Sequence, residues 1–220
     1  MELTKEIEMI ELDGGGAYLI HTESKNYLID TGLPKNEEEI LNKLKKVLGD
    51  NSLDAILLTH HDVDHVGNLK AVQQKFGGKA YIHPLDLPYA SSMRNRPGIK
   101  HIIEKLIKPA VSEDIYTFNE FNDSEIEIIH TPGHTPGHCI IKYKDYLFTG
   151  DLFKYLDNQI VCMKKKMNYD NSKMAKSINL LLKTDAKYLC PAHTDKAKAI
   201  EFNEKIKNEL RKAGEEYGKD

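Results

Sequence analysis

Histidine and aspartate side chains gather at four places along the 220-residue chain. Imidazole nitrogens and carboxylate oxygens are the usual ligands of catalytic zinc, and also of iron or manganese. The first place is His-His-Asp-Val-Asp-His at residues 60–65, and the second is His-Thr-Pro-Gly-His-Thr-Pro-Gly-His at residues 130–138. The other two are Asp151 in Thr-Gly-Asp and His193 in Pro-Ala-His. This clustering predicts a metal site.

Each of the four places comes just after a short apolar run that is typical of a β-strand. These runs lie at residues 55–58, 126–129, 146–149 and 188–190. A single aspartate after a strand is more often a turn former, but loops at one edge of a sheet can converge on a point. We therefore expect the four clusters to meet in space.

Within the first cluster, alternation along an extended chain sorts the side chains by direction. Successive side chains of an extended segment point to opposite sides, so His60, Asp62 and Asp64 are expected to face one way. His61 is then expected to face the other way. A turn after Asp64 would bring His65 to the side of the ligands.

The remaining pattern indicates how these loops are positioned. Apolar residues recur at helical spacing over residues 36–48, and acidic residues crowd the first turn of that segment. Alternating or apolar runs predict further strands, and helical periodicity predicts further helices. The expected strands also include residues 7–12, 17–20, 26–30, 79–82 and 140–143, and the expected helices also include residues 68–76, 171–182 and 197–213.

Residues 85–111 combine weak helical patterning with three prolines, which indicates an irregular helical insertion. The order of the elements is strands, a flanking helix, then strands and helices again. This order predicts two β-sheets packed face to face with helices on their outer faces, in a single domain covering residues 1–220.

Charge and composition exclude several classes of protein. The chain carries 31 basic and 34 acidic residues, for a net charge of −3, so no global field would attract nucleic acid or a membrane. No run approaches the roughly 20 apolar residues of a membrane span, and the N-terminus lacks an apolar signal region. Cys139, Cys162 and Cys190 include no Cys-x-x-Cys pair, which favours buried thiols in a reducing compartment. The expected location is the cytoplasm, and the expected partner is a small-molecule substrate.

The His-x-Asp-x-Asp-His segment, the two Thr-Pro-Gly-His repeats, Thr-Gly-Asp and the late histidine together resemble the metallo-β-lactamase superfamily, in its glyoxalase II-like form. The resemblance implies a four-layer αβ/βα sandwich and two metal ions with seven ligands. It implies that one ion is held by His60, Asp62 and His134 and the other by Asp64, His65 and His193, with Asp151 bridging the two.

The same resemblance implies a hydrolase. A hydroxide bridging two metal ions would attack an ester-like bond of a thioester, lactone, amide or phosphodiester. Asp64 would orient the hydroxide and pass on its proton. Two other classes of function stay open: a di-iron oxidoreductase centre and a non-catalytic metal-binding or sensor protein.

Asp62 departs from the commonest pattern of the family, which has histidine at this position. Three carboxylates and a hydroxide carry about four negative charges, enough to offset two divalent cations. Carboxylate is also a harder ligand than imidazole. We therefore expect two divalent ions, with zinc first and iron or manganese as alternatives.

Several other residues near these motifs are candidates for supporting roles. Asp30, in a Leu-Ile-Asp-Thr-Gly segment, is expected either to orient a ligand histidine or to form a plain turn. His138 is expected to brace its loop rather than bind metal. His83 and Asp86 fit either a cleft wall or a capped turn.

Tyr155 and Tyr169 follow Asp151 and are candidate oxyanion donors, although ordinary core or surface tyrosines are more common. The lysine run at residues 164–166 is best explained as a solvated loop.

Overall fold

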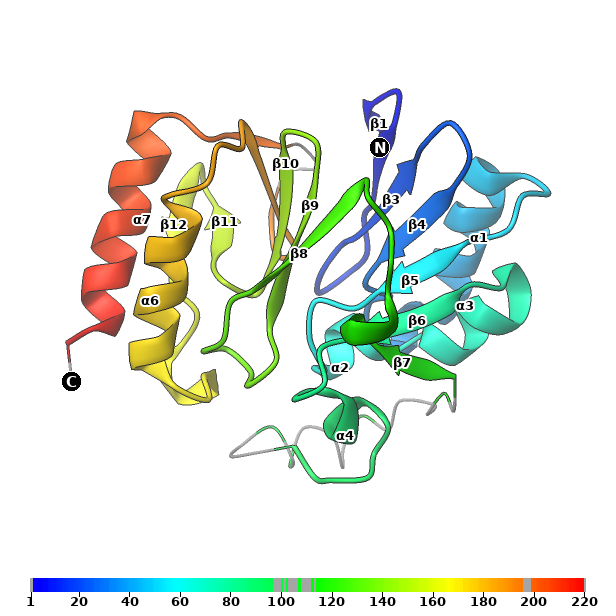
Figure 1. The fold of residues 1–220 in the computed structure, drawn as a ribbon, viewed down its shortest axis with the longest axis horizontal. Coiled ribbons are helices and arrows are strands. Elements are labelled where there is room, and N and C mark those ends of the chain that lie inside the picture. Colours follow the sequence, from blue (N-terminus) through cyan, green and yellow to red (C-terminus); the bar gives the residue numbers. More distant parts are fainter. Residues whose placement is uncertain are drawn as a thin grey trace.

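Two β-sheets face each other in the computed structural model, and helices cover the outer face of each sheet (Figure 1). The structure describes residues 2–96, 114–195 and 199–219, together with Lys100, Ile102, Ile107 and Ser112. The layers run helices, sheet, sheet, helices, which confirms the predicted αβ/βα sandwich.

The first sheet has seven strands in chain order. They are β1 (Glu2–Thr4), β2 (Ile7–Ile10), β3 (Ala17–His21), β4 (Asn26–Ile29), β5 (Ala55–Leu57), β6 (Lys79–Ile82) and β7 (Ile115–Thr117). The first four strands pair antiparallel, and β4 to β7 pair parallel. Parallel neighbours need a crossover connection. Helices α1 (Glu37–Leu48), α2 (Val63–Val66) and α3 (Leu69–Phe76) lie in two of these crossovers.

The second sheet has five strands in the order β14-β13-β10-β9-β8. They are β8 (Ile126–His130), β9 (Cys139–Tyr143), β10 (Tyr146–Gly150), β13 (Tyr188–Pro191) and β14 (Ile200–Glu201). Strands β10 and β13 are parallel and are connected through α6 (Asn171–Leu181), which lies beside α7 (Glu204–Tyr217) on the outer face. A separate hairpin, β11 (Lys154–Leu156) and β12 (Gln159–Val161), follows β10.

Short helical segments complete the description. They are η1 (Pro34–Asn36), α4 (Leu87–Ala90), η2 (Phe118–Glu120) and η3 (Lys165–Met167). Helix α4 is the described helix of the predicted insertion at residues 85–111. Most of that insertion after Arg96 lies outside the described residues.

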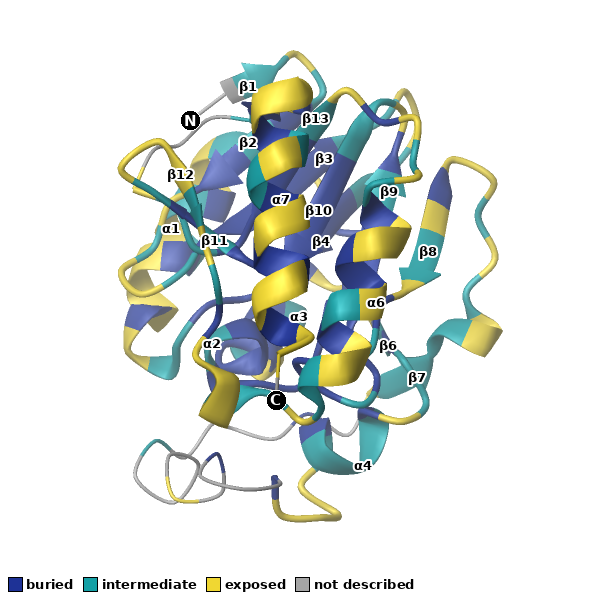
Figure 2. Ribbon diagram, turned by 90° about the vertical axis from the view of Figure 1, so that its left-hand side faces the viewer, coloured by how far each residue is buried: buried dark blue, intermediate teal, exposed yellow. Residues whose placement is uncertain are grey.

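Three apolar cores hold the layers together, and their residues are dark blue in Figure 2. The first joins α1 and α3 to the seven-stranded sheet, as in the buried helix positions Ile40 and Leu44. The second joins α6 and α7 to the five-stranded sheet through residues such as Ile178 and Leu210. The third lies between the two sheets. Helices and strands therefore bury the faces that their periodicity predicted.

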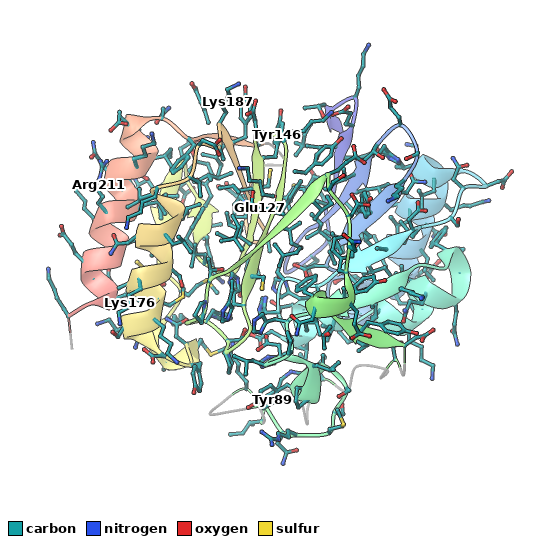
Figure 3. The ribbon with its side chains drawn as sticks, viewed as in Figure 1. Tyr89, Glu127, Tyr146, Lys176, Lys187 and Arg211 are labelled. Carbon is teal, nitrogen blue, oxygen red and sulfur yellow. The ribbon has the colours of Figure 1, made fainter. Side chains whose placement is uncertain are left out.

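The outer surface of the helix layer is polar. Lys176 on α6 and Arg211 on α7 lie on the side of the helices away from the sheet (Figure 3).

Tyr146 and Tyr188 stack at 4.8 Å between ring centroids where β10 and β13 begin. Among the described residues, no helix combines the length and apolar character that crossing a membrane requires.

The last predicted helix, at residues 197–213, has the wrong boundaries. The described chain instead forms β14 at Ile200–Glu201, paired with β13, and the helix runs from Glu204 to Tyr217. The side chain of Asn203 accepts a hydrogen bond from the backbone N–H of Ile206. This capping bond starts the helix, because Asn satisfies a free N–H of the first turn.

Candidate metal centre

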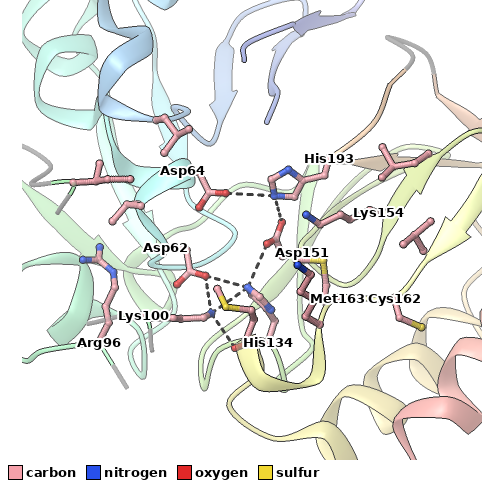
Figure 4. Close-up of a pocket in the computed structure, with 17 residues that line it drawn as sticks. Asp62, Asp64, Arg96, Lys100, His134, Asp151, Lys154, Cys162, Met163 and His193 are labelled. Atoms are coloured by element: carbon pink, nitrogen blue, oxygen red, sulfur yellow. Dashed lines mark hydrogen bonds and ion pairs between the residues drawn. The ribbon is translucent and has the colours of Figure 1, made fainter. Parts of the chain in front are cut away.

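The four His and Asp clusters meet at one edge of the sandwich, between the two sheets. The segment at residues 60–65 follows β5 and runs into α2, and the segment at residues 131–138 joins β8 to β9. Asp151 follows β10 directly, and His193 follows β13. Figure 4 shows Asp62, Asp64, His134, Asp151 and His193 pointing toward one another. The expected convergence of strand ends is therefore present.

The first group of possible ligands, called the buried group here, consists of His60, Asp62, His134 and Asp151. One ligand atom from each lies within 4.8 Å of the others, and all four residues are buried. Nε2 of His134 lies 3.0 Å from Oδ2 of Asp62 and 3.3 Å from Oδ2 of Asp151. Nε2 of His60 lies 3.6 Å from the same Asp62 oxygen.

The second group, called the open group here, consists of Asp64, His65, Asp151 and His193. Nε2 of His193 lies 3.0 Å from Oδ1 of Asp151, and Nε2 of His65 lies 3.2 Å from the same oxygen. Oδ2 of Asp64 lies 3.4 Å from Nε2 of His193. Asp151 thus directs Oδ1 toward the open group and Oδ2 toward the buried group.

The backbone around Asp64 and His65 differs from the extended backbone that the sequence predicted. Asp62 has an extended backbone, but Val63 begins the helical turn α2, and the backbone N–H of His65 donates to the carbonyl oxygen of Asp62 at 2.9 Å. The expectation of an extended segment through Asp64 was therefore wrong. Because of this helical turn, the side chains of Asp64 and His65 lie apart from that of Asp62 and belong to the open group.

The chemistry of these donors fits metal ions. Nε2 of His60, Nε2 of His65, Oδ1 of Asp62 and Oδ1 of Asp151 are buried and form no hydrogen bond of normal geometry in the described part of the chain, and the close contacts of Asp151 Oδ1 are with Nε2 of His65 and His193, which are possible ligand atoms themselves. Buried polar atoms in folded proteins are nearly always bonded, so four such atoms together need an explanation. Imidazole nitrogen and carboxylate oxygen are also the ligand types of zinc, iron and manganese.

The charges of the site support the same fit. Burial alone would raise the pKa of Asp151, but the imidazoles of His193 and His65 hold the pKa of this carboxyl well below its usual value. Burial alone would lower the pKa of His193, yet the carboxylates of Asp151 and Asp64 raise it to about 9. The imidazole therefore carries a proton near neutral pH, and binding of a metal would release it.

Asp30 orients His65, which is one of the two roles that the sequence suggested for it. Its Oδ2 accepts from Nδ1 of His65 at 2.7 Å and from the hydroxyl of Thr59 at 2.7 Å, while Oδ1 accepts from the backbone N–H of Thr59 at 2.8 Å. The hydrogen bond from Nδ1 leaves Nε2 of His65 facing the open group. Asp30 has a φ of 59°, a left-handed conformation that is uncommon outside glycine.

Asp86 connects the loop of the first cluster to the loop that carries His134. Oδ2 of Asp86 lies 2.9 Å from Nδ1 of His61 and accepts from the hydroxyl of Thr135 at 2.6 Å. Its Oδ1 accepts from the backbone N–H of Gly137 at 2.6 Å. A Cβ at Gly137 would lie 2.8 Å from Oδ1 of Asp86, so glycine permits this close approach. The sequence around Asp86 suggested only a turn or a cleft wall. It did not indicate that Asp86 joins the two loops.

His138 belongs to neither ligand group. Burial, followed by the neighbouring His134, lowers the pKa of His138 to about 3, so its ring is neutral. Nε2 of His138 accepts from the backbone N–H of Asp151 at 3.1 Å, and Nδ1 lies 2.9 Å from the hydroxyl of Thr131. The ring therefore braces the backbone of the shared carboxylate.

A cavity of about 510 Å³ opens above the site. Asp62, Asp64, His134, Asp151 and His193 form part of its wall (Figure 4). The rest of the wall comes from the segment before η1, from α2, from the hairpin, from the segment before η3 and from η3 itself, and it is largely apolar apart from the basic residues Arg96, Lys100, Lys154 and Lys164. Its apolar side chains include Leu33, Val63, Leu156, Val161, Met163 and Met167.

The two tyrosines named as candidate oxyanion donors do not line this cavity. Tyr155 is buried in the second core, and Tyr169 is 51% exposed, with the ammonium of Lys173 over its ring. His83 also lies outside the cavity and stacks on His130 at 4.0 Å between centroids. Tyr155 and His83 thus have packing roles, and Tyr169 is a largely exposed tyrosine.

Cys139 and Cys190 are buried, as expected. Cys162 is not, because it follows the hairpin strand β12 and forms part of the cavity wall.

The family of this chain is identified by comparison with known proteins. A model of the metallo-beta-lactamase superfamily matches residues 11–193, which include all seven candidate ligands. The chain belongs to this superfamily. The two groups of ligands therefore lie in a chain whose family the motifs of the sequence had indicated.

Two curated relatives illustrate the range of this superfamily. The probable metallo-hydrolase YflN of Bacillus subtilis is 30% identical over 171 residues, covering 68% of this chain and 65% of the relative. A hydroxyacylglutathione hydrolase of Shewanella loihica is 31% identical over 136 residues, covering 61% of this chain and 45% of the relative. The chain thus spans less than two thirds of the length of either relative.

Solved structures of superfamily members share the fold. The di-iron-bound form of TTHA1623 is 27% identical, with a TM-score of 0.64 over 81% of this chain and 87% of that one. An archaeal superfamily protein from Sulfolobus tokodaii has a TM-score of 0.69 at 19% identity, over 95% of this chain and 86% of that one.

Proposed function

We propose that this chain is a metal-dependent hydrolase that cleaves an ester-like bond of a small molecule, with two divalent ions bound by the buried and open groups. The ligands would be His60, Asp62 and His134 for one ion and Asp64, His65 and His193 for the other, with Asp151 shared. The observation that carries the proposal is the position of Asp151, whose two oxygens face two different groups at the wall of one cavity.

Two divalent ions, when bound, lower the pKa of a water toward neutrality and polarise the bond to be cleaved. Asp64 is the residue of the chain that would handle the proton. Its side chain is 23% exposed, lines the cavity, and holds Oδ2 at 3.4 Å from Nε2 of His193. From this position, Oδ2 would accept a proton from water and return it to the leaving group.

The size of the cavity and the named relatives support a small-molecule substrate. A cavity of about 510 Å³ suits a small molecule. The named relatives include metallo-hydrolases and a hydroxyacylglutathione hydrolase, which supports hydrolysis. Thioesters, lactones, amides and phosphodiesters are the candidate substrates, and a panel of them assayed with Zn, Mn and Fe would identify the preferred bond and metal.

The metal identity is a separate part of the proposal. We propose zinc first, with iron or manganese as alternatives because Asp62 replaces the more usual histidine. TTHA1623, which has been solved with two irons, supports the inclusion of iron. Metal analysis of protein purified from defined medium tests this point. A strictly zinc-containing protein that no other ion activates would contradict the tolerance for iron and manganese.

Replacement of Asp64 by Asn tests the proposed proton transfer. Amide oxygen cannot take up the proton, so turnover should fall by about 10²- to 10⁴-fold, the usual contribution of a general acid or base. Asp185→Asn is the matched control, because Asp185 is an exposed aspartate paired with Lys142 on the surface. Circular dichroism should show both variants folded. Unchanged turnover in the folded Asp64 variant would falsify the role.

A further inference from the structure

Lys100 places a positive charge among the atoms of the buried group. Its Nζ lies 2.6 Å from Oδ2 of Asp62 and 3.1 Å from Nε2 of His134 (Figure 4). It also donates to the carbonyl oxygen of His134 at 3.3 Å. Asp62 Oδ2 and His134 Nε2 are themselves 3.0 Å apart. The ammonium therefore contacts two of the atoms that are available to a metal ion in this group.

Burial makes this contact strong. The side chain of Lys100 is 6% exposed, and that of Asp62 is 11% exposed. A buried ammonium needs a counterion, and the Asp62 carboxylate supplies one. The pair is neutral overall, as a neutral histidine at position 62 would be. Lys100 therefore offsets the extra negative charge that Asp62 brings to the site.

Among the residues that the structure describes, the open group forms no ion pair with a lysine or an arginine, although Lys154 lines the same cavity. Asp64, His65 and His193 form ion pairs only with carboxylates and imidazoles among the residues that the structure describes. Asp151 likewise pairs with imidazoles alone within that set. The two groups thus share a carboxylate and have similar ligands, but in the described part of the chain a lysine forms an ion pair with the buried group and none does with the open group.

We propose that Lys100 competes with the metal ion for the buried group, so that the two ions bind in a fixed order. The first ion binds the open group tightly. The second ion binds the buried group weakly, because a divalent cation and the ammonium repel each other at the same two atoms and Lys100 must leave Asp62. This inference rests on the proposed metal centre. It adds that Lys100 controls the order in which the two ions bind.

Metal titration of the full chain tests the competition without any measurement of activity. The protein is freed of metal with a chelator and titrated with Co²⁺ against a chromophoric competitor, which yields two stepwise Kd values. Lys100→Met removes the charge and keeps a long side chain. We expect the second Kd of this variant to be tighter by at least about tenfold, the size of effect that a neighbour of a ligand has on metal affinity, with the first Kd unchanged.

Three further variants make the result specific. Lys100→Arg keeps the positive charge and should keep the weak second Kd. Lys164→Met removes the charge of an exposed lysine that lines the same cavity, and it should leave both Kd values as in the wild type. Lys100→Gln serves as a second uncharged variant where Lys100→Met does not fold.

The outcomes separate this inference from the proposed function. Two equal Kd values in the wild type, or an unchanged or weaker second Kd in the folded uncharged variants, would overturn the competition. Absence of hydrolysis with every substrate would instead overturn the proposed function, while the order of metal binding would still be measured.

Discussion

The buried and open groups differ in their surroundings more than in their ligand types. In the buried group, the side chains of His60 and His134 are 0% and 1% exposed, and Lys100 contacts the group. In the open group, the side chains of Asp64 and His193 are 23% and 14% exposed and face the cavity. Each group combines two imidazoles with two carboxylates, one of them shared.

The fold thus places similar residues in different surroundings, and in the proposed function they have different roles. The side chain of Asp64 is 23% exposed and is not paired with Lys100, so in the proposed function it exchanges a proton with a bound molecule, whereas that of Asp62, which also lines the cavity, is 11% exposed and paired with Lys100. Each group also has its own supporting aspartate. Asp30 holds His65 of the open group, and Asp86 holds the loop of His134 in the buried group.

The largest effect is expected from Asp151, because it belongs to both groups. Asp151→Asn removes a charge that both metal ions would share, so both should bind weakly. We expect metal affinity to fall by at least about 100-fold, above the range seen when a neighbour of a ligand is changed. Plasma mass spectrometry of the dialysed variant measures the metal content. Two retained ions per chain would show that Asp151 is not shared.

Asp30→Asn should weaken the open group selectively. The amide no longer provides the charged acceptor that fixes the ring of His65, so the affinity of the open group should fall by about 10- to 100-fold. Co²⁺ titration separates the two binding steps. Equal weakening of both steps would contradict the assignment of Asp30 to one group.

Asp86→Ala should weaken the buried group rather than the open group. Loss of the buried carboxylate leaves the hydroxyl of Thr135 and the N–H of Gly137 without their acceptor, at a cost of about 1–3 kcal/mol of stability for each such group. The loop of His134 should loosen, and the weaker metal step should weaken further. Urea unfolding and Co²⁺ titration measure the two effects. A change in the open group alone would contradict this role.

The smallest effect concerns pH and lies outside both groups. Burial, followed by the neighbouring His130, lowers the pKa of His83. The folded chain then takes up the His83 proton less readily than the unfolded chain, so stability falls as the pH drops through the ordinary imidazole range near 6.5. Urea unfolding between pH 7.5 and 5.5 should show a shallower fall for His83→Gln. A steeper fall would contradict the prediction.

The positions of the candidate ligands could be predicted because each follows a short apolar run, and the ends of strands from both sheets converge at one edge of the sandwich. The helical turn that begins at Val63 could not be predicted from the sequence, because a helix of four residues is too short to show a periodic pattern of apolar residues. The hairpin that starts at Lys154 was missed for the same reason. The contact between Lys100 and Asp62 joins segments far apart in the chain, and no local pattern indicates which lysine reaches a given carboxylate.

The central claim is that seven side chains hold two metal ions through one shared aspartate. Anomalous diffraction from crystals of the metal-loaded chain tests it directly. We expect two peaks, one at about 2.0–2.2 Å from ligand atoms of His60, Asp62 and His134 and one at the same range from Asp64, His65 and His193, each near one oxygen of Asp151. A single peak at full loading, or peaks away from Asp151, would contradict it.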